Sequence, residues 1–229
     1  MQTMLRRQVH GFVATIAHTV RSDGDLSTST VPSDELAERR HDLVARPWNV
    51  LRQVHSDRVI RVDEERVHDR PNADALVAQQ PNIAIAVHSG DCVPVGFVHA
   101  DGAVAAAHAG WKGLEAGVLE STVRALRQIG SGPITAVVGP HIHADRYEFG
   151  AKALDRLARR FGDGVRSVTA AGTPALNLTA ALAVELERLD IPVVNWSQDC
   201  TALDETNYWS HRARKETGRI ALVAWLEHQ

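Results

Sequence analysis

One short run of apolar residues limits the fold of this chain more than any other feature: Ile83-Ala84-Ile85-Ala86-Val87. The run is shorter than a typical globular helix and has no polar residue on either face, so it predicts a strand buried on both faces. A sheet built around such a strand needs cover on each side. We therefore expect an α/β (mixed α+β) fold, with a mixed β-sheet core flanked by helices.

Turn signals and apolar spacing predict the neighbouring elements. Asp101-Gly102 is a favoured turn dipeptide and predicts a hairpin between strands 94–98 and 103–107. Apolar residues at helical spacing predict a helix over 114–129, ended by the Gly and Pro residues of 130–133. The other expected elements are strands over 59–62, 134–138, 193–194 and 220–225, and helices over 33–45 (capped by Ser33), 147–161 and 179–189. No linker or repeat divides the chain, so residues 1–229 are expected to form a single domain.

Composition excludes several classes of partner. The formal net charge is -3, and no cluster of Lys and Arg with interleaved aromatic residues predicts nucleic-acid binding. No apolar window is long enough to span a membrane, and residues 1–19 lack the apolar core of a signal peptide. Only Cys92 and Cys200 are present, too few for a disulfide scaffold. We therefore expect a soluble cytoplasmic protein with reduced thiols and no membrane or nucleic-acid partner.

Three residues at the edges of predicted strands are candidate metal ligands: His55, Cys92 and His108. Two imidazoles and a thiolate suit zinc, and three protein ligands leave the open position that a catalytic site needs. Zinc lowers the pKa of a bound water from about 16 to about 7. No short zinc signature links the three, so spacing alone favours ordinary hydrogen-bonded roles. Asp91, beside Cys92, is either a residue that orients a ligand or shuttles a proton, or an ordinary turn carboxylate.

Two cations are candidate phosphate ligands. Lys112 lies in Gly110-Trp111-Lys112-Gly113, a turn that opens a helix, where unpaired N–H groups favour an anion. The alternative is a plain strand-to-helix turn with Trp111 in the core. Arg212 can bind an oxyanion through two N–H groups, or it can be an exposed arginine in a basic patch.

Other titratable residues are interpreted as structural. The pair His141 and His143 follows Gly139-Pro140, which ends a strand, so the two rings need not converge on a metal. Cys200 has no base beside it and is expected to be a buried thiol. His88 adjoins the Cys92 loop and is expected to tune it rather than to bind the metal.

The chain resembles the bacterial YfiH-type laccase-domain proteins, also described as polyphenol oxidase-like, peptidoglycan-editing-factor type or purine nucleoside phosphorylase proteins. The resemblance covers most of the chain from about Leu51 onward. Its motifs are Gln53-Val54-His55, Asn72-Ala73-Asp74-Ala75-Leu76-Val77, Asp91-Cys92-Val93-Pro94, His108-Ala109-Gly110-Trp111-Lys112-Gly113, Gly139-Pro140, Tyr147-Glu148-Phe149-Gly150, Ser210-His211-Arg212 and Thr217-Gly218-Arg219.

The resemblance implies an enzyme whose metal ligands are His55, Cys92 and His108. It implies zinc-dependent phosphorolysis of adenosine, inosine, guanosine and methylthioadenosine, with adenosine deamination as a companion activity. The implied partners are a purine nucleoside and phosphate. The sequence departs from the family pattern at Ser89-Gly90, preceded by His88, where Thr-Ala is usual, at His141, and in the stretch 22–27. These departures put the substrate preference in question and leave the ligands intact.

Several alternatives stay open. The laccase name implies copper and oxidation of phenols, although a multicopper oxidase needs more histidine ligands than this trio. A thiol hydrolase with Cys92 as nucleophile, including one that edits peptidoglycan precursors, would use the same pocket. A non-catalytic binding module stabilised by zinc is the alternative outside enzymes. The sequence predicts no particular oligomeric state.

Overall fold

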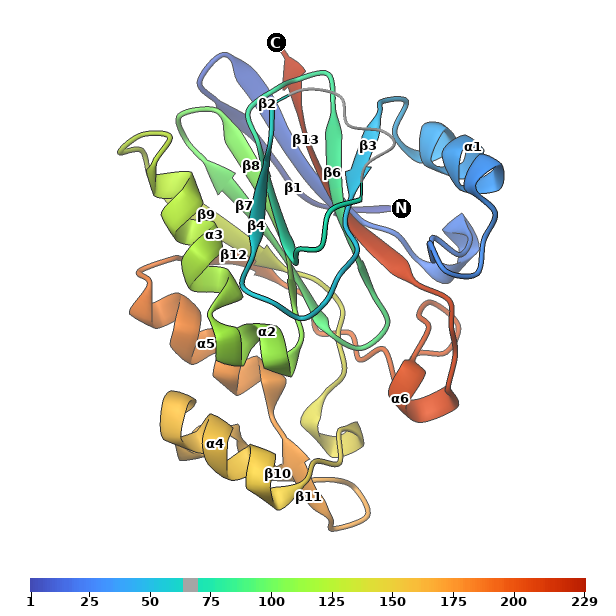
Figure 1. The fold of residues 1–229 in the computed structure, drawn as a ribbon, viewed down its shortest axis with the longest axis vertical. Helices are drawn as coiled ribbons and strands as arrows, with labels where there is room; N and C mark the ends of the chain where they lie inside the picture. The colour runs from blue at the N-terminus through green and yellow to red at the C-terminus, as the bar shows by residue number, and fades with distance from the viewer. Residues whose placement is uncertain (64–69) are drawn as a thin grey trace.

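Two mixed β-sheets stack face to face at the centre of the protein (Figure 1). The structure, a computed structural model, describes residues 1–63 and 70–229. The first sheet runs in the order β1 (Gln2–Val9), β2 (Phe12–His18), β13 (Ile220–His228), β6 (Ala84–Ser89), β3 (Trp48–Val50). The second runs in the order β12 (Val193–Trp196), β9 (Ile134–Val138), β7 (Val93–His99), β8 (Ala103–Ala109), β5 (Ala75–Ala78), β4 (Val59–Val62). In the first sheet, β3 pairs parallel with β6. In the second, β4 pairs parallel with β5 at one edge and β12 pairs parallel with β9 at the other.

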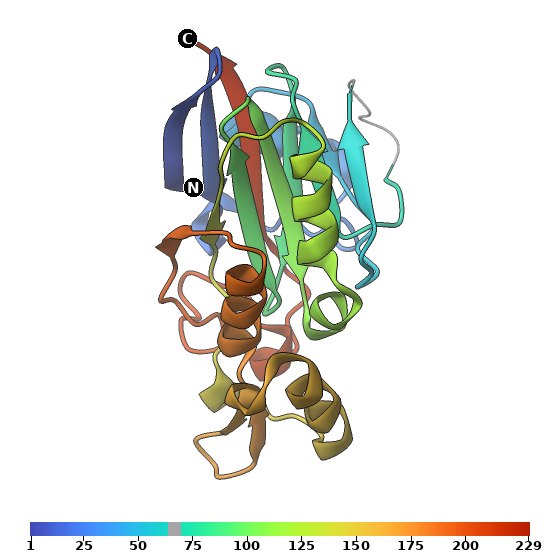
Figure 2. The same ribbon diagram turned by 90° about the vertical axis from the view of Figure 1, so that its left-hand side faces the viewer.

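Helices cover the outer faces of both sheets (Figures 1 and 2). The helix α1 (Ser33–Leu43) lies over the first sheet. On the second sheet, α2 (Trp111–Ala116) and α3 (Val118–Arg127) pack against the strands. The helix α5 (Leu178–Arg188) packs beside α2 and α3, and α4 (Ala151–Phe161) packs against α5. The short α6 (His211–Arg214) precedes β13, and the small hairpin β10 (Arg166–Val168) and β11 (Pro174–Leu176) lies beside α4.

Strand alternation sorts side chains between the layers. On β6, Ile85 and Val87 join the core between the sheets, whereas Ala84 and Ala86 join the core beneath α1. On β8, alternate alanines join the core beneath the helices, and Val104 and Ala106 face the other sheet. Because successive side chains point to opposite faces and both faces are covered, residues 84–87 of β6 and 103–107 of β8 are all apolar. The strand predicted from the run 83–87 is therefore confirmed as buried on both faces.

Most predicted elements are present, with corrections at their ends. The hairpin around Asp101-Gly102 is the β7–β8 pair, and strands 59–62 and 134–138 have the predicted bounds. The predicted helix 114–129 is wrong as one helix: Gly117, at φ 95°, divides it into α2 and α3. The helix predicted from Tyr147 begins at Ala151, because Gly150 is extended. Ser33 is the first residue of α1 and Pro32 precedes it as the cap, so the predicted cap was wrong.

The sequence pattern missed part of the architecture. The paired strands β1 and β2 and the short strands β3 and β5 were not predicted, so the expected single mixed sheet is two sheets. In these strands the alternation of apolar and polar residues is either interrupted by extra polar residues or too short to predict a strand. Among the described residues, none of the helices is long and apolar enough to cross a membrane.

Candidate metal centre

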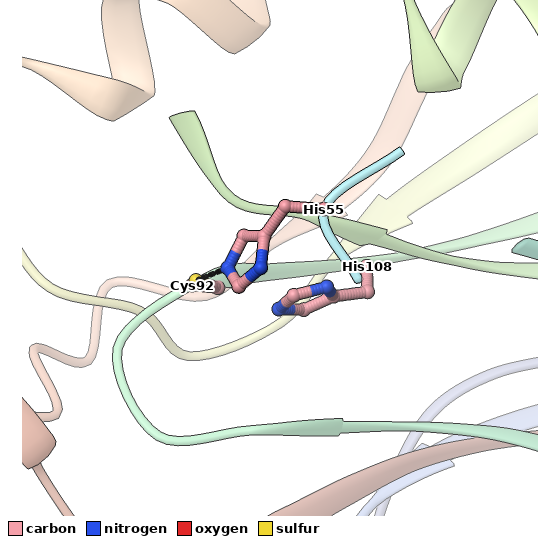
Figure 3. Close-up of side chains that lie close together, drawn as sticks. All are labelled: His55, Cys92 and His108. Atoms are coloured by element: carbon pink, nitrogen blue, oxygen red, sulfur yellow. Dashed lines mark hydrogen bonds between the residues drawn. The ribbon is translucent and has the colours of Figure 1, made fainter. Parts of the chain in front are cut away.

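The three predicted ligands converge at one end of the β-sandwich (Figure 3). His55 lies in the segment after β3, Cys92 lies between β6 and β7, and His108 is near the end of β8. Their ligand atoms all lie within 4.8 Å of one another, and His55 Nε2 is 3.7 Å from Cys92 Sγ. The two imidazole rings meet edge to face, with centroids 4.8 Å apart.

This geometry fits zinc. Zinc bonds of about 2.0–2.1 Å to nitrogen and about 2.3 Å to sulfur, in tetrahedral geometry, place a nitrogen and a sulfur ligand about 3.5 Å apart. The His55–Cys92 separation is close to that value. Within the described residues, this is the one group of three His, Cys, Asp or Glu side chains placed to hold an ion. A three-ligand set is the arrangement of catalytic rather than structural zinc sites.

The carboxylate of Asp74 organises two of the three ligands. Asp74 is fully buried and precedes β5 directly. Its oxygens accept hydrogen bonds from the backbone N–H groups of Val54, His55 and Ser56 at 3.2, 3.0 and 2.6 Å, and from Ser56 Oγ at 2.9 Å. Its Oδ1 also lies 2.9 Å from His108 Nδ1. With the Nδ1 proton held by Asp74, the Nε2 lone pair of His108 is free to bind a metal.

The backbone hydrogen bonds from residues 54–56 to Asp74 also explain the conformation of His55. Three consecutive N–H groups reach one carboxylate only if the chain turns sharply, and His55 adopts φ 60° at the centre of the turn. A left-handed non-glycine residue costs on the order of 1–3 kcal/mol. Hydrogen bonds to a charged group contribute about 1.5–3 kcal/mol each, so the bonds to Asp74 outweigh the strain.

Electrostatics favour the metal-binding form of the thiol. Burial on its own raises the pKa of Cys92, but the charge of His108 and hydrogen bonds from His108 and His55 lower it to about 6. Burial lowers the pKa of His108, whereas the Cys92 thiolate and Asp74 raise it to about 9. A thiolate is therefore available near neutral pH, and a metal ion would displace the proton from His108.

Gly110 leaves room for the ligands. A Cβ atom at this position would lie 2.8 Å from Cys92 Sγ and 2.7 Å from His55 Cδ2. No side chain larger than hydrogen fits there without moving both ligands. The glycine in the motif after His108 is thus required by close approach to the centre.

Asp91 contacts other parts of the site. Its carboxylate accepts hydrogen bonds from Thr201 Oγ1 at 2.8 Å, Ser210 Oγ at 2.7 Å and the backbone N–H of Arg212 at 2.6 Å. It is buried, with φ 110°. These bonds tie the Cys92 loop to the start of α6. The residue that orients a metal ligand is Asp74, and the predicted roles of Asp91 in orientation or proton transfer stay predictions.

A cavity of about 460 Å³ opens beside the three ligands. Arg212 lines it, with its guanidinium 4.7 Å from the Tyr147 ring centroid and its Nη1 donating to the Glu148 carbonyl at 2.9 Å. Lys112 is exposed, is not among the residues that line the cavity, and lies 5.5 Å from the centroid of the Trp111 ring. The structure brings Arg212 to the site and leaves Lys112 outside it.

The remaining titratable residues have ordinary partners. His141 is buried, with Nδ1 2.9 Å from the Gly139 carbonyl and Nε2 2.9 Å from Thr179 Oγ1. Cys200 is buried, and its Sγ accepts a hydrogen bond from the backbone N–H of His143. Neither joins the metal centre, as the sequence predicted.

The fold and the site define an α/β protein with a candidate His–Cys–His metal centre beside a cavity. The chain belongs to the family whose model is described as multi-copper polyphenol oxidoreductase laccase, which matches residues 7–227. This confirms the resemblance drawn from the motifs.

Relatives and solved structures support the same family. Purine nucleoside phosphorylase Rv2149c of Mycobacterium tuberculosis is 37% identical over 180 residues, 77% of this chain and 71% of the relative. A Streptomyces coelicolor protein also named purine nucleoside phosphorylase is 36% identical over 182 residues, 77% of this chain and 74% of the relative. The crystal structure of a Neisseria meningitidis protein of family DUF152 covers 99% of this chain and 100% of its own, with TM-score 0.81 and 28% identity. The structure of hypothetical protein YfiH from Bacillus licheniformis has TM-score 0.82 and 25% identity over 97% of this chain and 99% of its own.

Removing the charge of Asp74 tests its role as organiser. We expect Asp74→Asn to lower zinc affinity roughly 10–100-fold, because the Asn side chain cannot hold His108 and the 54–56 turn as a carboxylate does. Competition with a chromogenic chelator measures the affinity. Asp34→Asn, on the exposed face of α1, is the control and should bind zinc as the wild type does. Equal affinity in all three proteins would contradict the role of Asp74.

Asp74 also predicts an acid-sensitive part of the stability. Burial on its own raises the pKa of this carboxyl, but hydrogen bonds from His108 and Ser56 lower it to about 2, below the ordinary 3.8. The stabilisation is therefore complete above the unfolded value and is lost as pH falls through about 2. In urea denaturation of metal-free protein, the stability difference between wild type and Asp74→Asn should shrink from about pH 5 to about pH 3. A difference that stays constant or grows over this range would contradict the assignment.

Proposed function

We propose that this protein is a zinc-dependent purine nucleoside phosphorylase acting on adenosine, inosine, guanosine and methylthioadenosine, with adenosine deamination as a companion activity. The observation that carries the proposal is the three-ligand centre at the edge of a cavity of about 460 Å³, in a chain whose relatives are named purine nucleoside phosphorylases. That volume lies in the range of small-molecule sites.

The ligand residues have separate tasks in this proposal. Cys92 and the Nε2 atoms of His55 and His108 would hold the ion, and Asp74 keeps the proton on Nδ1 of His108. A bound zinc ion supplies a Lewis acid that polarises a substrate oxygen or activates water. Gly110 lets the ligands approach one another. Because the three ligand residues line the cavity, a substrate bound there would lie next to the ion.

The charge of the cavity suits the second substrate. In phosphorolysis an oxygen of inorganic phosphate bonds to the ribose C1′, while the bond from C1′ to the purine nitrogen breaks and the base leaves with its electron pair. Phosphate must therefore be held beside the nucleoside. Of the described residues, four arginines line the cavity: Arg52, Arg70, Arg212 and Arg219. Among the described residues that line it, Asp91 is the one carboxylate, and its oxygens already accept three hydrogen bonds.

Copper-dependent phenol oxidation is the second candidate, favoured by the description of the family model. Two imidazoles and one thiolate also suit copper. A multicopper oxidase needs several further histidine ligands, and the described residues form one candidate group of three. The phosphorylase proposal needs one ion and is therefore preferred. A thiol hydrolase would use the Cys92 thiolate directly and would not require metal.

Product analysis separates these candidates. We expect metal-analysed protein incubated with adenosine to release adenine and ribose 1-phosphate only when phosphate is present. Cys92→Ala should abolish the reaction because it removes the thiolate ligand, while Cys200→Ala, at the buried thiol outside the centre, should retain it. Chromatography resolves adenine, inosine and the sugar phosphate.

Other product patterns would contradict the proposal. Inosine as the sole product would leave deamination alone, and oxidation of a phenol by copper-loaded protein would favour the laccase candidate. Full activity after chelation would favour the hydrolase. Unfolding on zinc removal, followed by circular dichroism, would favour a structural metal in a binding module.

Arg212 is predicted to contact phosphate. Arg212→Ala should raise the KM for phosphate about tenfold or more, because a charge-assisted hydrogen bond contributes about 1.5–3 kcal/mol. Lys112→Ala tests the other cation predicted from the sequence; its place outside the cavity lining predicts a smaller effect. Steady-state kinetics at varied phosphate measure both. An unchanged phosphate KM in Arg212→Ala would contradict the role of Arg212.

A further inference from the structure

A second group of polar side chains faces the same cavity from the α1 side of the first sheet. His88 is the next even-numbered residue of β6 after Ala84 and Ala86, so strand alternation places it on the face that α1 covers. The Gln53 side chain fixes the strand here: its Nε2 donates to the His88 carbonyl at 2.8 Å, and its Oε1 accepts from the His88 N–H at 2.7 Å.

The ring of His88 has an unused nitrogen. His88 is 7% exposed and lines the cavity. Its Nε2 is buried and has no hydrogen-bond partner among the described residues. A buried polar atom without a partner costs about 1–3 kcal/mol, so such atoms in native proteins usually meet a ligand, ion or water.

Arg40 of α1 shows the same feature. Its Nε and Nη2 are buried and have no partner in the part of the chain that the structure describes. Its guanidinium lies 5.9 Å from the centroid of the Trp48 ring. Burial, together with the charge of Arg70, lowers the pKa of Arg40 to about 10. The described residues show no ion pair for Arg40 or for Arg70.

Cations and hydroxyl groups complete this end of the cavity. Arg70 and Arg219 line it, together with Ser27, Thr28 and Ser29 of the segment before α1. Arg219 is held in place by donating from Nη1 to the Glu216 and Gly218 carbonyls. Burial lowers the pKa of His88 to about 3, and the charges of Arg40, His108, Arg219 and Arg70 act in the same direction. Arg70, Arg219 and His88 thus line one cavity.

We propose that Arg70, Arg219 and His88 form a second oxyanion subsite in the cavity, which binds a phosphoryl group, and that the charge of Arg40, which is not among the lining residues, supports it. Gathered positive charge and unused buried donors cost stability until an anion joins them, and a phosphoryl group has enough acceptor oxygens for this set. The subsite is separate from Arg212, whose backbone N–H and Nη1 already donate to Asp91 and to Glu148.

This inference deepens the proposed function and rests on it for the nucleoside part of the ligand. A phosphoryl group can come from inorganic phosphate, the co-substrate of phosphorolysis, or from a phosphate carried on the nucleoside. In the second case the preferred substrate is a nucleotide rather than a nucleoside. Both sources share the same recognition chemistry and differ in what is attached to the phosphorus.

Calorimetric titration of the zinc-loaded protein at low ionic strength tests the subsite. The probes are inorganic phosphate, adenosine and adenosine 5′-monophosphate. We expect Arg70→Gln to weaken binding of inorganic phosphate or of the monophosphate roughly tenfold or more, and to leave adenosine binding and zinc content unchanged. Arg159→Gln, which removes an exposed charge on α4 away from the cavity lining, should match the wild type.

The two sources give different patterns. If the subsite takes the nucleoside's own phosphate, the monophosphate binds the wild type more tightly than adenosine and loses that advantage in Arg70→Gln. If it takes inorganic phosphate, phosphate binding weakens and the monophosphate binds no better than adenosine. His88→Gln should weaken the same probe as Arg70→Gln does. Because Arg70 is exposed, its variant is informative even if His88→Gln, on a buried strand, proves unstable.

Two results would overturn the subsite: neither anionic probe binds the wild type, or both bind Arg70→Gln and the wild type equally. Failure of the proposed function has a different signature. In that case the protein shows no phosphorolysis, while an anionic probe still binds and depends on Arg70.

Discussion

The carboxylate of Asp74 is the interaction on which the rest of the site depends. It accepts five hydrogen bonds, four from the turn at 54–56 and one from His108. The turn and β8 are far apart in sequence, and Asp74 joins them beneath the point where the ligands meet. A buried charge is tolerated only when it is this fully bonded. The same bonds that stabilise Asp74 therefore place His55 and His108.

A second buried carboxylate, Asp91, also joins segments of the site that are far apart in sequence. It holds Thr201, Ser210 and the backbone of Arg212, and so brings the C-terminal segment to the cavity. The oxygens of both carboxylates accept hydrogen bonds from neighbouring N–H and O–H groups. Within the part of the chain that the structure describes, Asp91 is therefore the only carboxylate that lines the cavity beside its arginines, although the chain as a whole has a net charge of -3. This separation of charge makes the cavity suited to oxyanions.

The sequence predicted the elements whose signal is local. The apolar strand at 83–87, the Asp101-Gly102 hairpin and the amphipathic stretch after Gly113 all depend on neighbouring residues, and all three are present. Gly117 was missed as a helix break because a single glycine within an apolar period does not reveal a left-handed conformation. The three ligands were found because their types suit zinc and they lie at strand ends, and the family motifs then singled them out.

Asp74 illustrates what could not be predicted. It was part of a motif, but its partners are about twenty and more than thirty residues away, and only the folded chain shows them. Its one local signal is a carboxylate placed directly before an apolar strand. Asp91 adjoins Cys92, which left open whether it orients a ligand, shuttles a proton or is an ordinary turn carboxylate, and only the folded chain shows its bonds to Thr201, Ser210 and the backbone of Arg212. The sequence also could not predict that Arg212 lines the cavity and Lys112 does not, because proximity to the cavity depends on packing between distant segments.

X-ray absorption at the zinc edge of the reconstituted protein tests the central claim most directly. We expect one zinc ion per chain, with one sulfur at about 2.3 Å, two imidazole nitrogens at about 2.0–2.1 Å and a fourth ligand that is not from the protein. A shell with two sulfurs, a shell with none, or a protein that retains no zinc would contradict a catalytic centre built from His55, Cys92 and His108.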